Sequence, residues 1–202
     1  MIHPDTELRY INEEKGYGVV ATQFIPKGTI TWIGDELDQV FTIERLNKMP
    51  FEIRAIVDKY SYRDKEGEFI LCWDHARFVN HSFNSNCIST PYNFELAVRD
   101  IQPGEELTDD YGYLNLTRPL FFPPEKGSSR NAVMPDDLLH FHSEWDAKLI
   151  SAFRHFNLVQ QPLVKFIEKR FVEKVKAVAA GQQPMDSILN CYYDPNKYRK
   201  AA

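Results

Sequence analysis

The spacing of apolar residues changes along the chain near residue 114. Up to that point, short runs of β-branched and aromatic residues alternate with turns that contain glycine or proline. This is the pattern of short strands. Thr42 is predicted to cap a short helix that Pro50 interrupts, and a second short helix would carry Ile53, Ile56 and Val57. The predicted strands are 17–22, 29–34, 60–62, 69–73, 95–99 and 106–108.

Beyond residue 134 the apolar residues recur at helical spacing. Residues 114–134 come first and are rich in proline, glycine and serine, which predicts a loop. Ser143 and Asp146 form a possible capping box, Pro162 suits a first helical position, and Gly181 is placed to end a helix. Short strands followed by helices predict an α+β protein. The predicted apolar face of the first helix is Trp145, Leu149, Ile150, Phe153 and Phe156.

Composition narrows the class of protein. The 202 residues are 43% hydrophobic and 13% aromatic, which suits one globular domain with a modest extension. No apolar run is long enough for a membrane span, and the first residues do not resemble a secretory signal. Three cysteines without paired spacing predict a reducing, intracellular location, in the cytoplasm or alternatively the nucleus. The net charge of −5 disfavours nucleic-acid binding and suits a basic partner.

Three segments do not fit ordinary core or loop. The first is Lys15-Gly16-Tyr17-Gly18, where paired glycines either relieve strain in a bend or let the backbone approach a ligand closely. The second is Arg77-Phe78-Val79-Asn80-His81-Ser82, in which a polar run follows an apolar pair. The third is Gly104-Glu105-Glu106-Leu107-Thr108-Asp109-Asp110-Tyr111-Gly112-Tyr113, an acidic strand that ends in Asp-Tyr.

Together these segments resemble the signature motifs of the SET-domain lysine methyltransferases. The resemblance implies a β-clip of small sheets with a pseudoknot, in which the segment after Asn-His-Ser and the segment before Asp-Tyr thread past each other. We expect this SET domain over residues 1–115, followed by a loop and C-terminal helical extension over residues 116–202.

The resemblance also implies roles for single residues. The cofactor is S-adenosylmethionine, and its product is S-adenosylhomocysteine. Tyr111 corresponds to the catalytic tyrosine, and Tyr60 or Tyr62 is a candidate second tyrosine of the lysine channel, with a core position as the alternative. Arg77 is the residue of the second segment expected to brace its loop. The cofactor-binding residues implied in this way are Lys15, Gly16, Tyr17, Gly18, Arg77, Asn80, His81, Tyr111 and Phe122.

Two departures from the family pattern bear on the chemistry. Asp109 stands two residues before the tyrosine, where many relatives have Phe or Tyr, so the number of methyl groups added is left open. The stretch after Tyr113 lacks the cysteines of a zinc-binding segment, so we predict no metal. Phe121, Phe122 or Trp145 would then cover the adenine, and the C-terminal helices would close the lysine channel.

The sequence therefore predicts a protein-lysine N-methyltransferase that acts on a protein or peptide. The alternative is a SET-like module that binds cofactor or peptide without turnover. No membrane partner is expected.

Overall fold

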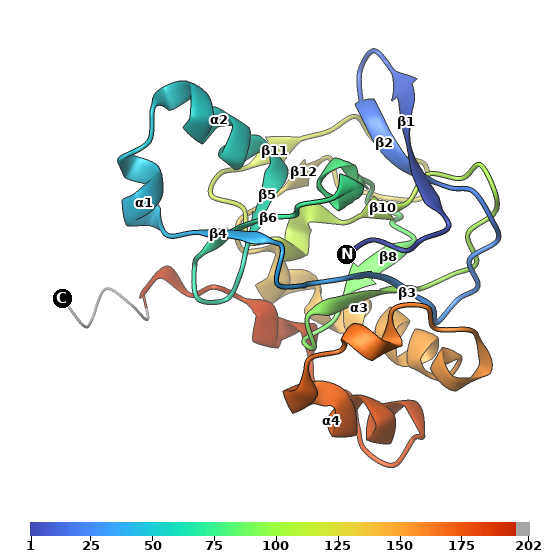
Figure 1. Ribbon diagram of the computed structural model, residues 1–202. Coiled ribbons are helices and arrows are strands. Elements are labelled where there is room, and N and C mark those ends of the chain that lie inside the picture. The colour runs from blue at the N-terminus through green and yellow to red at the C-terminus, as the bar shows by residue number, and fades with distance from the viewer. Residues whose placement is uncertain (197–202) are drawn as a thin grey trace.

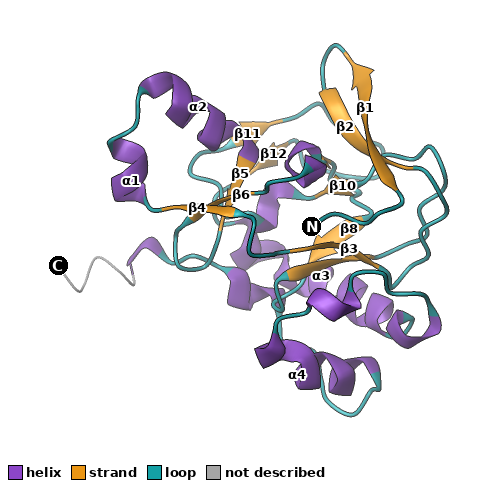
Figure 2. Cartoon of the chain, viewed as in Figure 1, coloured by secondary structure: helices purple, strands orange, loops and turns teal. Residues whose placement is uncertain are grey.

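The structure, a computed structural model, describes residues 1–196, so residues 197–202 of the predicted extension lie outside the described part. Small sheets occupy one part of the molecule, the helices that follow residue 136 lie beneath them, and the helices within residues 43–60 lie to one side (Figures 1 and 2). The strands are β1 (Thr6–Asn12), β2 (Gly16–Ala21), β3 (Ile30–Ile33), β4 (Gln39–Phe41), β5 (Ser61–Arg63), β6 (Phe69–Leu71), β7 (Asn80–His81), β8 (Cys87–Ser89), β9 (Phe94–Ala97), β10 (Thr108–Asp109), β11 (Leu120–Phe121) and β12 (Ala132–Val133).

Four α-helices and several 3₁₀ turns complete the described part of the chain. The helices are α1 (Ile43–Asn47), α2 (Phe51–Tyr60), α3 (Asp137–Phe153) and α4 (Lys169–Ala179). The 3₁₀ turns are His75–Phe78, Tyr111–Tyr113, Phe156–Leu158, Val164–Phe166 and Ile188–Cys191. No helix among residues 1–196 has the length and apolar content that crossing a bilayer requires.

The strands form five small sheets. β1 and β2 make an antiparallel hairpin, β3-β9-β8 and β4-β6-β5 are three-stranded, and β11 pairs with β12. β7 and β10 are parallel, with Thr108 opposite Asn80 and Asp109 opposite His81. This pairing brings the second and third sequence motifs side by side although about thirty residues separate them.

One hydrophobic core joins the β3-β9-β8 sheet to the C-terminal helices. Phe94 and Leu96 of β9 pack with Leu149 and Phe153 of α3 and Val175 of α4, and all five side chains are buried. Smaller clusters lie under the β1-β2 hairpin and between α1, α2 and β6. The helices following residue 136 therefore share a core with the strands and fix the sheet from below.

Several helix ends follow the sequence. The side chain of Thr42 accepts a hydrogen bond from the backbone N–H of Arg45, as its predicted cap role requires, and Pro50 stands immediately before α2. Gly181 has φ +70° and donates its N–H to the carbonyl of Val178, a left-handed helix end that suits glycine.

The predicted starts of the later helices were wrong. α3 begins at Asp137, so Ser143 is inside the helix and does not cap it. The carboxylate of Asp146 instead accepts hydrogen bonds from the Ser187 hydroxyl (2.6 Å) and the Ile188 N–H (2.8 Å), which ties the C-terminal segment to α3. Ile150 is 44% exposed and is not part of the buried face. Only a 3₁₀ turn follows Pro162, and α4 begins at Lys169.

Candidate active site

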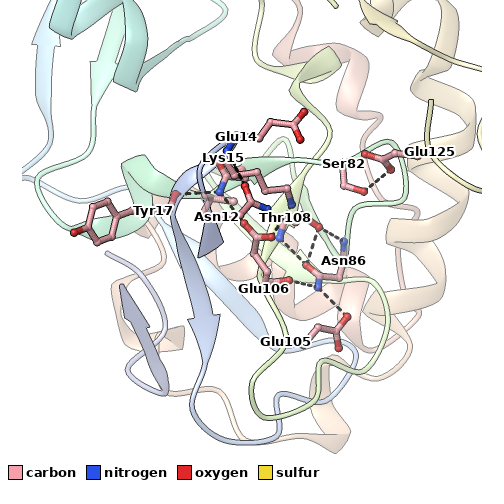
Figure 3. Close-up of polar contacts among 12 residues, drawn as sticks. Asn12, Glu14, Lys15, Tyr17, Ser82, Asn86, Glu105, Glu106, Thr108 and Glu125 are labelled. Carbon is pink, nitrogen blue, oxygen red and sulfur yellow. Dashed lines mark hydrogen bonds and ion pairs between the residues drawn. The ribbon is translucent and has the colours of Figure 1, made fainter. Parts of the chain in front are cut away.

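The glycine segment lies against the Asn80 side chain. Nδ2 of Asn80 donates to the carbonyl of Tyr17 (3.0 Å) and to Oε1 of Glu106 (2.7 Å). Nζ of Lys15 forms an ion pair with Oε2 of the same carboxylate at 2.7 Å (Figure 3). A Cβ atom on Gly18 would lie 2.5 Å from Glu106 Oε1 and 2.9 Å from Asn80 Nδ2. The hairpin, β7 and the segment before β10 thus meet at a point where only glycine fits.

Asn86, in the segment that follows the second motif, holds the backbone of the third motif. Its side chain is buried, its Nδ2 donates to the carbonyl of Glu106 (2.8 Å), and its Oδ1 accepts from the N–H of Thr108 (2.8 Å; Figure 3). Both bonds hold backbone groups, so they fix the path of the chain into β10. Asn86 is the asparagine that the sequence retains after the altered Phe83–Ser85 loop.

His81 lies in an aromatic pocket. Its Nδ1 accepts the backbone N–H of Tyr111 (3.2 Å), which assigns the proton of the neutral ring to Nε2. Its ring centroid is 4.4 Å from that of Phe83 and 4.1 Å from that of Phe122. Burial, with the nearby charge of Arg130, lowers the pKa of His81 to about 3. His81 is therefore neutral at physiological pH, and its buried Nε2 has no hydrogen-bond partner within residues 1–196.

Of the three aromatic residues considered as a cover for the cofactor, Phe122 is the one in contact with His81. Phe121 is 78% exposed. Trp145 is buried in the core against Tyr113 and Phe141, at centroid distances of 5.3 and 6.0 Å. The position of Phe122 makes it the candidate that the geometry favours.

The loop that carries Phe122 is held by polar contacts. The Ser82 hydroxyl donates to Oε2 of Glu125 (2.8 Å; Figure 3), and the Asn84 side chain donates to the carbonyl of Lys126 (2.9 Å). Arg130 forms ion pairs with both Asp110 and Asp137, which lie immediately before Tyr111 and at the start of α3. Residues 1–196 contain no group of three or more His, Cys, Asp or Glu side chains arranged to hold a metal ion.

Tyr111 lies between this region and a large cavity. Its hydroxyl donates to the carbonyl of Val79 (2.8 Å), and its backbone N–H donates to His81. Burial raises the pKa of the Tyr111 phenol, so the hydroxyl keeps its proton at neutral pH. The cavity has a volume of about 830 Å³, and Tyr60, Tyr62 and Tyr111 all line it.

The two other candidate tyrosines are both partly buried in that wall. Tyr60 ends α2, with its ring centroid 5.3 Å from that of Phe78. Tyr62 on β5 packs edge-on against Trp32 at 5.8 Å, and burial raises its pKa. Arg77 is exposed at the edge of the same cavity, with Nη1 3.5 Å from the carbonyl of Cys72. The structure thus gathers Lys15, Gly18 and Asn80 on one side of Tyr111, whereas Arg77, Tyr60 and Tyr62 lie on the other.

The C-terminal segment forms part of the cavity wall. Asp186, Asn190 and Tyr192 line it together with residues of β5 and the strand β9. Asn115 anchors this segment, because its Nδ2 donates to the carbonyl of Cys191 (2.8 Å) and to that of Arg63 (3.0 Å).

Sequence reasoning missed three polar residues of the region: Glu106, Arg130 and Glu95. Glu106 lies inside the third motif, so its position beside Lys15 and Asn80 was open to prediction. No local sequence pattern marks Arg130 as part of the site. Its partner Asp110 is twenty residues away in the chain, and its partner Asp137 belongs to α3. Glu95 was predicted only as part of a strand, yet its side chain is buried and faces the cavity.

Comparison with known proteins bears on the fold. Residues 16–112 match the family model described as SET domain. Over these residues the chain has the SET-domain fold. This confirms the fold expected from the three motifs.

Curated relatives of this SET domain are histone-lysine methyltransferases. One, from Mycosarcoma maydis, is named "Histone-lysine N-methyltransferase, H3 lysine-36 specific" and is 32% identical over 111 residues, which cover 49% of this chain and 11% of the relative. Another, "Histone-lysine N-methyltransferase Set2" of Drosophila melanogaster, is 31% identical over 119 residues, covering 52% of this chain and 5% of the relative. The chain thus matches only a small part of each relative's length.

Among solved structures, the methyltransferase domain of human histone-lysine N-methyltransferase SETMAR has a TM-score of 0.43 and 22% identity to this chain. The match covers 66% of this chain and 58% of that domain.

Proposed function

We propose that the protein is an S-adenosylmethionine-dependent protein-lysine N-methyltransferase. The observation that carries the proposal is the position of Tyr111. Its backbone is bonded to His81 in the aromatic pocket, and its side chain lines the cavity that Tyr60 and Tyr62 share. A group at this junction can act between a donor bound on one side and an amine inserted from the other.

The pocket around Asn80 and His81 has the features that S-adenosylmethionine requires. Gly18 lets the Glu106 carboxylate and the Asn80 amide lie close to the hairpin backbone, so that both present polar atoms there. Nε2 of His81 offers an unpaired donor next to the rings of Phe83 and Phe122, where a flat heteroaromatic base can stack. Gly16–Gly18, Asn80, His81 and Phe122 would hold the cofactor, with Lys15 acting through Glu106.

When bound, the cofactor supplies an electrophilic methyl group on a sulfonium. The protein's own contribution is to position an amine and keep it neutral. The Tyr111 phenol stays protonated and is held by the Val79 carbonyl, so it serves as a fixed dipole rather than as a base. Tyr60 and Tyr62 provide an apolar wall with a polar edge, which admits an alkyl chain and excludes bulk water.

The substrate class follows from charge and from the relatives. A net charge of −5 suits a basic peptide, and two relatives are named for lysine 36 of histone H3. We take a lysine of a histone-like protein as the first substrate to test. An intracellular location, in the cytoplasm or nucleus, fits three cysteines that form no disulfide.

Two measurements on the full chain test the proposal. Calorimetry with S-adenosylhomocysteine measures binding, and transfer of tritiated methyl to recombinant histone H3 and to a cell lysate measures turnover. Tyr111→Phe is expected to reduce transfer about 100-fold, because removing one fixed dipole at a reacting centre has effects of that size. Cofactor affinity should stay within about threefold, since the Tyr111 N–H that bonds His81 is unchanged.

Tyr10→Phe is the matched control, because Tyr10 is 54% exposed on the hairpin. It should transfer at the parent rate. A Tyr111→Phe variant that did so too would contradict the assignment of Tyr111. Cofactor binding without transfer to any protein would instead support the binding module.

A further inference from the structure

Two acidic side chains are buried in the wall of the cavity. Glu95 on β9 is 7% exposed and Asp109 at the end of β10 is 6% exposed. Both line the cavity of about 830 Å³ together with Tyr62 and Tyr111. They therefore face the space that the proposed function assigns to the lysine side chain.

Burial of two neighbouring acids favours a state in which one of them stays protonated. They are hydrogen-bonded to each other, with Asp109 as the protonated donor and Glu95 as the acceptor. The Tyr113 hydroxyl donates to Oδ1 of Asp109 (3.0 Å), and the Ser89 hydroxyl donates to Oε1 of Glu95 (3.1 Å). Two hydroxyl donors thus converge on the pair, which carries at most one negative charge, on Glu95.

Burial makes Glu95 a group that titrates near neutrality. Desolvation raises the pKa of Glu95 to about 7, and it raises the pKa of Asp109 well above its ordinary value. The amino group of Met1 acts in the opposite direction on Glu95. The other titratable groups that interact with one or both acids are Tyr62, Cys72, Cys87, Asp110, Tyr111 and Tyr113.

A second observation marks this wall as a binding surface. Trp32 lines the same cavity, is 6% exposed, and its buried Nε1 has no hydrogen-bond partner within residues 1–196. An unpaired indole N–H is costly when buried, and an acceptor on a bound chain would satisfy it. The acids and this donor are thus parts of one polar surface inside an aromatic cavity.

We propose that Glu95 is the proton acceptor for the substrate lysine and that Asp109 is a positioning residue that holds it. The inference rests on the proposed function and adds a base to it. In the step, one N–H bond of the ammonium breaks, its electron pair stays on nitrogen, and an O–H bond forms on the Glu95 carboxylate. The products are a neutral amine and a pair of protonated carboxyl groups, and the proton later leaves through the cavity to solvent.

The step supplies what the reaction lacks at neutral pH. A free lysine with a pKa near 10.4 is neutral in only about one molecule in 2,500 at pH 7. A base within the channel deprotonates the bound ammonium to the neutral amine. After this proton transfer both carboxyl groups are uncharged, so they no longer favour the protonated form of the amine. Tyr111 is unsuited to this step because its phenol has a raised pKa.

The test is the pH dependence of methyl transfer to recombinant histone H3 between pH 6 and 10. For the parent, kcat/KM should rise through about pH 7 and then level off. Glu95→Gln keeps an acceptor for Asp109 and Ser89 but cannot take the proton. It should be about 100-fold slower at pH 7, and the deficit should fall below about 10-fold by pH 10, where solvent supplies neutral amine.

Two further variants separate a base from a structural role. Asp109→Asn still offers a donor to Glu95, so it should keep the rising limb and remain within about 10-fold of the parent. Glu173→Gln, at an exposed position of α4, should match the parent at every pH. A Glu95→Gln deficit that is the same at every pH, or a parent-shaped profile, would overturn the inference.

Infrared titration gives a readout that does not depend on turnover. The protein without cofactor should show a carboxylic-acid band of Glu95 that disappears as the pH passes about 7, apart from any band of Asp109, and Glu95→Gln should lack this titrating band. Absence of that band from the parent would overturn the inference whether or not transfer occurs. The band without transfer by the parent at any pH would overturn the proposed function, and with it the role of Glu95 in transfer.

Discussion

Glu106 and Asp109 lie three residues apart in one short segment, and their carboxyl groups are accommodated in opposite ways. Glu106 faces the glycine hairpin, where Lys15 and Asn80 neutralise and bond it. Asp109 faces the cavity, where its partner is another acid, Glu95. On one side of Tyr111, the Lys15 cation balances the charge of Glu106. On the other side, Asp109 stays protonated beside Glu95, so two charges of the same sign do not face each other.

The difference matches the chemistry proposed for each side. A polar, ion-paired surface suits a zwitterionic cofactor that carries its own ammonium and carboxylate groups. A cavity that must receive a cation and release it as a neutral amine is better served by a proton acceptor than by a fixed charge. A permanently ionised carboxylate would stabilise the ammonium, whereas a carboxylate whose pKa is raised to about 7, as for Glu95, can accept its proton.

The prediction with the largest expected effect tests this comparison through the free energy of unfolding. The raised pKa of Glu95 means that the folded state favours its protonated form, so folding becomes less favourable as the pH rises from about 4.5 through about 7. Glu95→Gln removes this titration. Its free energy of unfolding, relative to the parent, should therefore increase by about 2.5 kcal/mol between pH 5 and pH 8.

Urea denaturation of both proteins at four pH values in that range measures the difference directly. Titrations of groups that do not interact with Glu95 cancel in this difference. A difference that does not change with pH would mean that Glu95 is ionised throughout and that the two sides of Tyr111 are not distinguished in this way.

The next largest effect is steric and concerns Gly18 on the hairpin, where we propose that the cofactor binds. Gly18→Ala would place a Cβ 2.5 Å from Glu106 Oε1 and 2.9 Å from Ile11 Cγ1, so the carboxylate and Asn80 must move. We expect a loss of about 2 kcal/mol in stability and about a 30-fold weaker affinity for S-adenosylhomocysteine. Calorimetry on the folded variant measures the affinity.

Gly104→Ala is the control for Gly18→Ala. Gly104 has φ +85°, and a Cβ added there would meet no atom within 4 Å, so alanine costs about 1 kcal/mol through backbone strain alone. Its cofactor affinity should be unchanged. Equal losses of affinity in the two variants would show that the hairpin responds to general destabilisation and not to contact at Gly18.

Sequence reasoning brought together the motifs around Asn80 and Tyr111 but not the acids of the cavity wall, for a physical reason. Asn80, His81 and Tyr111 lie in motifs whose residue types are unusual together, and β7 and β10 align those motifs directly. The contact between Glu95 and Asp109 joins two strands fourteen residues apart in the chain and in different sheets. No local pattern marks a buried acid, because an acidic residue in a strand ordinarily faces solvent.

The helix ends also show that sequence reasoning predicts local contacts better than distant ones. Thr42 and Gly181 act through their own backbone neighbours, and both predictions were confirmed. Ser143 and Asp146 have the spacing of a capping box, but α3 already began at Asp137, so Asp146 bonds the C-terminal segment instead. The distant partner of a capping residue cannot be read from the spacing alone.

The smallest expected effect concerns Glu106 itself. Glu106→Gln keeps an acceptor for Asn80 Nδ2 and loses the charge that pairs with Lys15, whose side chain is 38% exposed. The stability loss should be below about 1 kcal/mol, because partly exposed ion pairs contribute little. Affinity for S-adenosylhomocysteine should fall about threefold at low salt and less at high salt, since screening weakens the same charge. Glu7→Gln, which removes an exposed ion pair with Arg9 on the same hairpin, is the control and should leave affinity unchanged. A loss as large as that of Gly18→Ala would mean that the carboxylate contacts the cofactor directly, so that both acids of this segment, and not Asp109 alone, would be part of the chemistry.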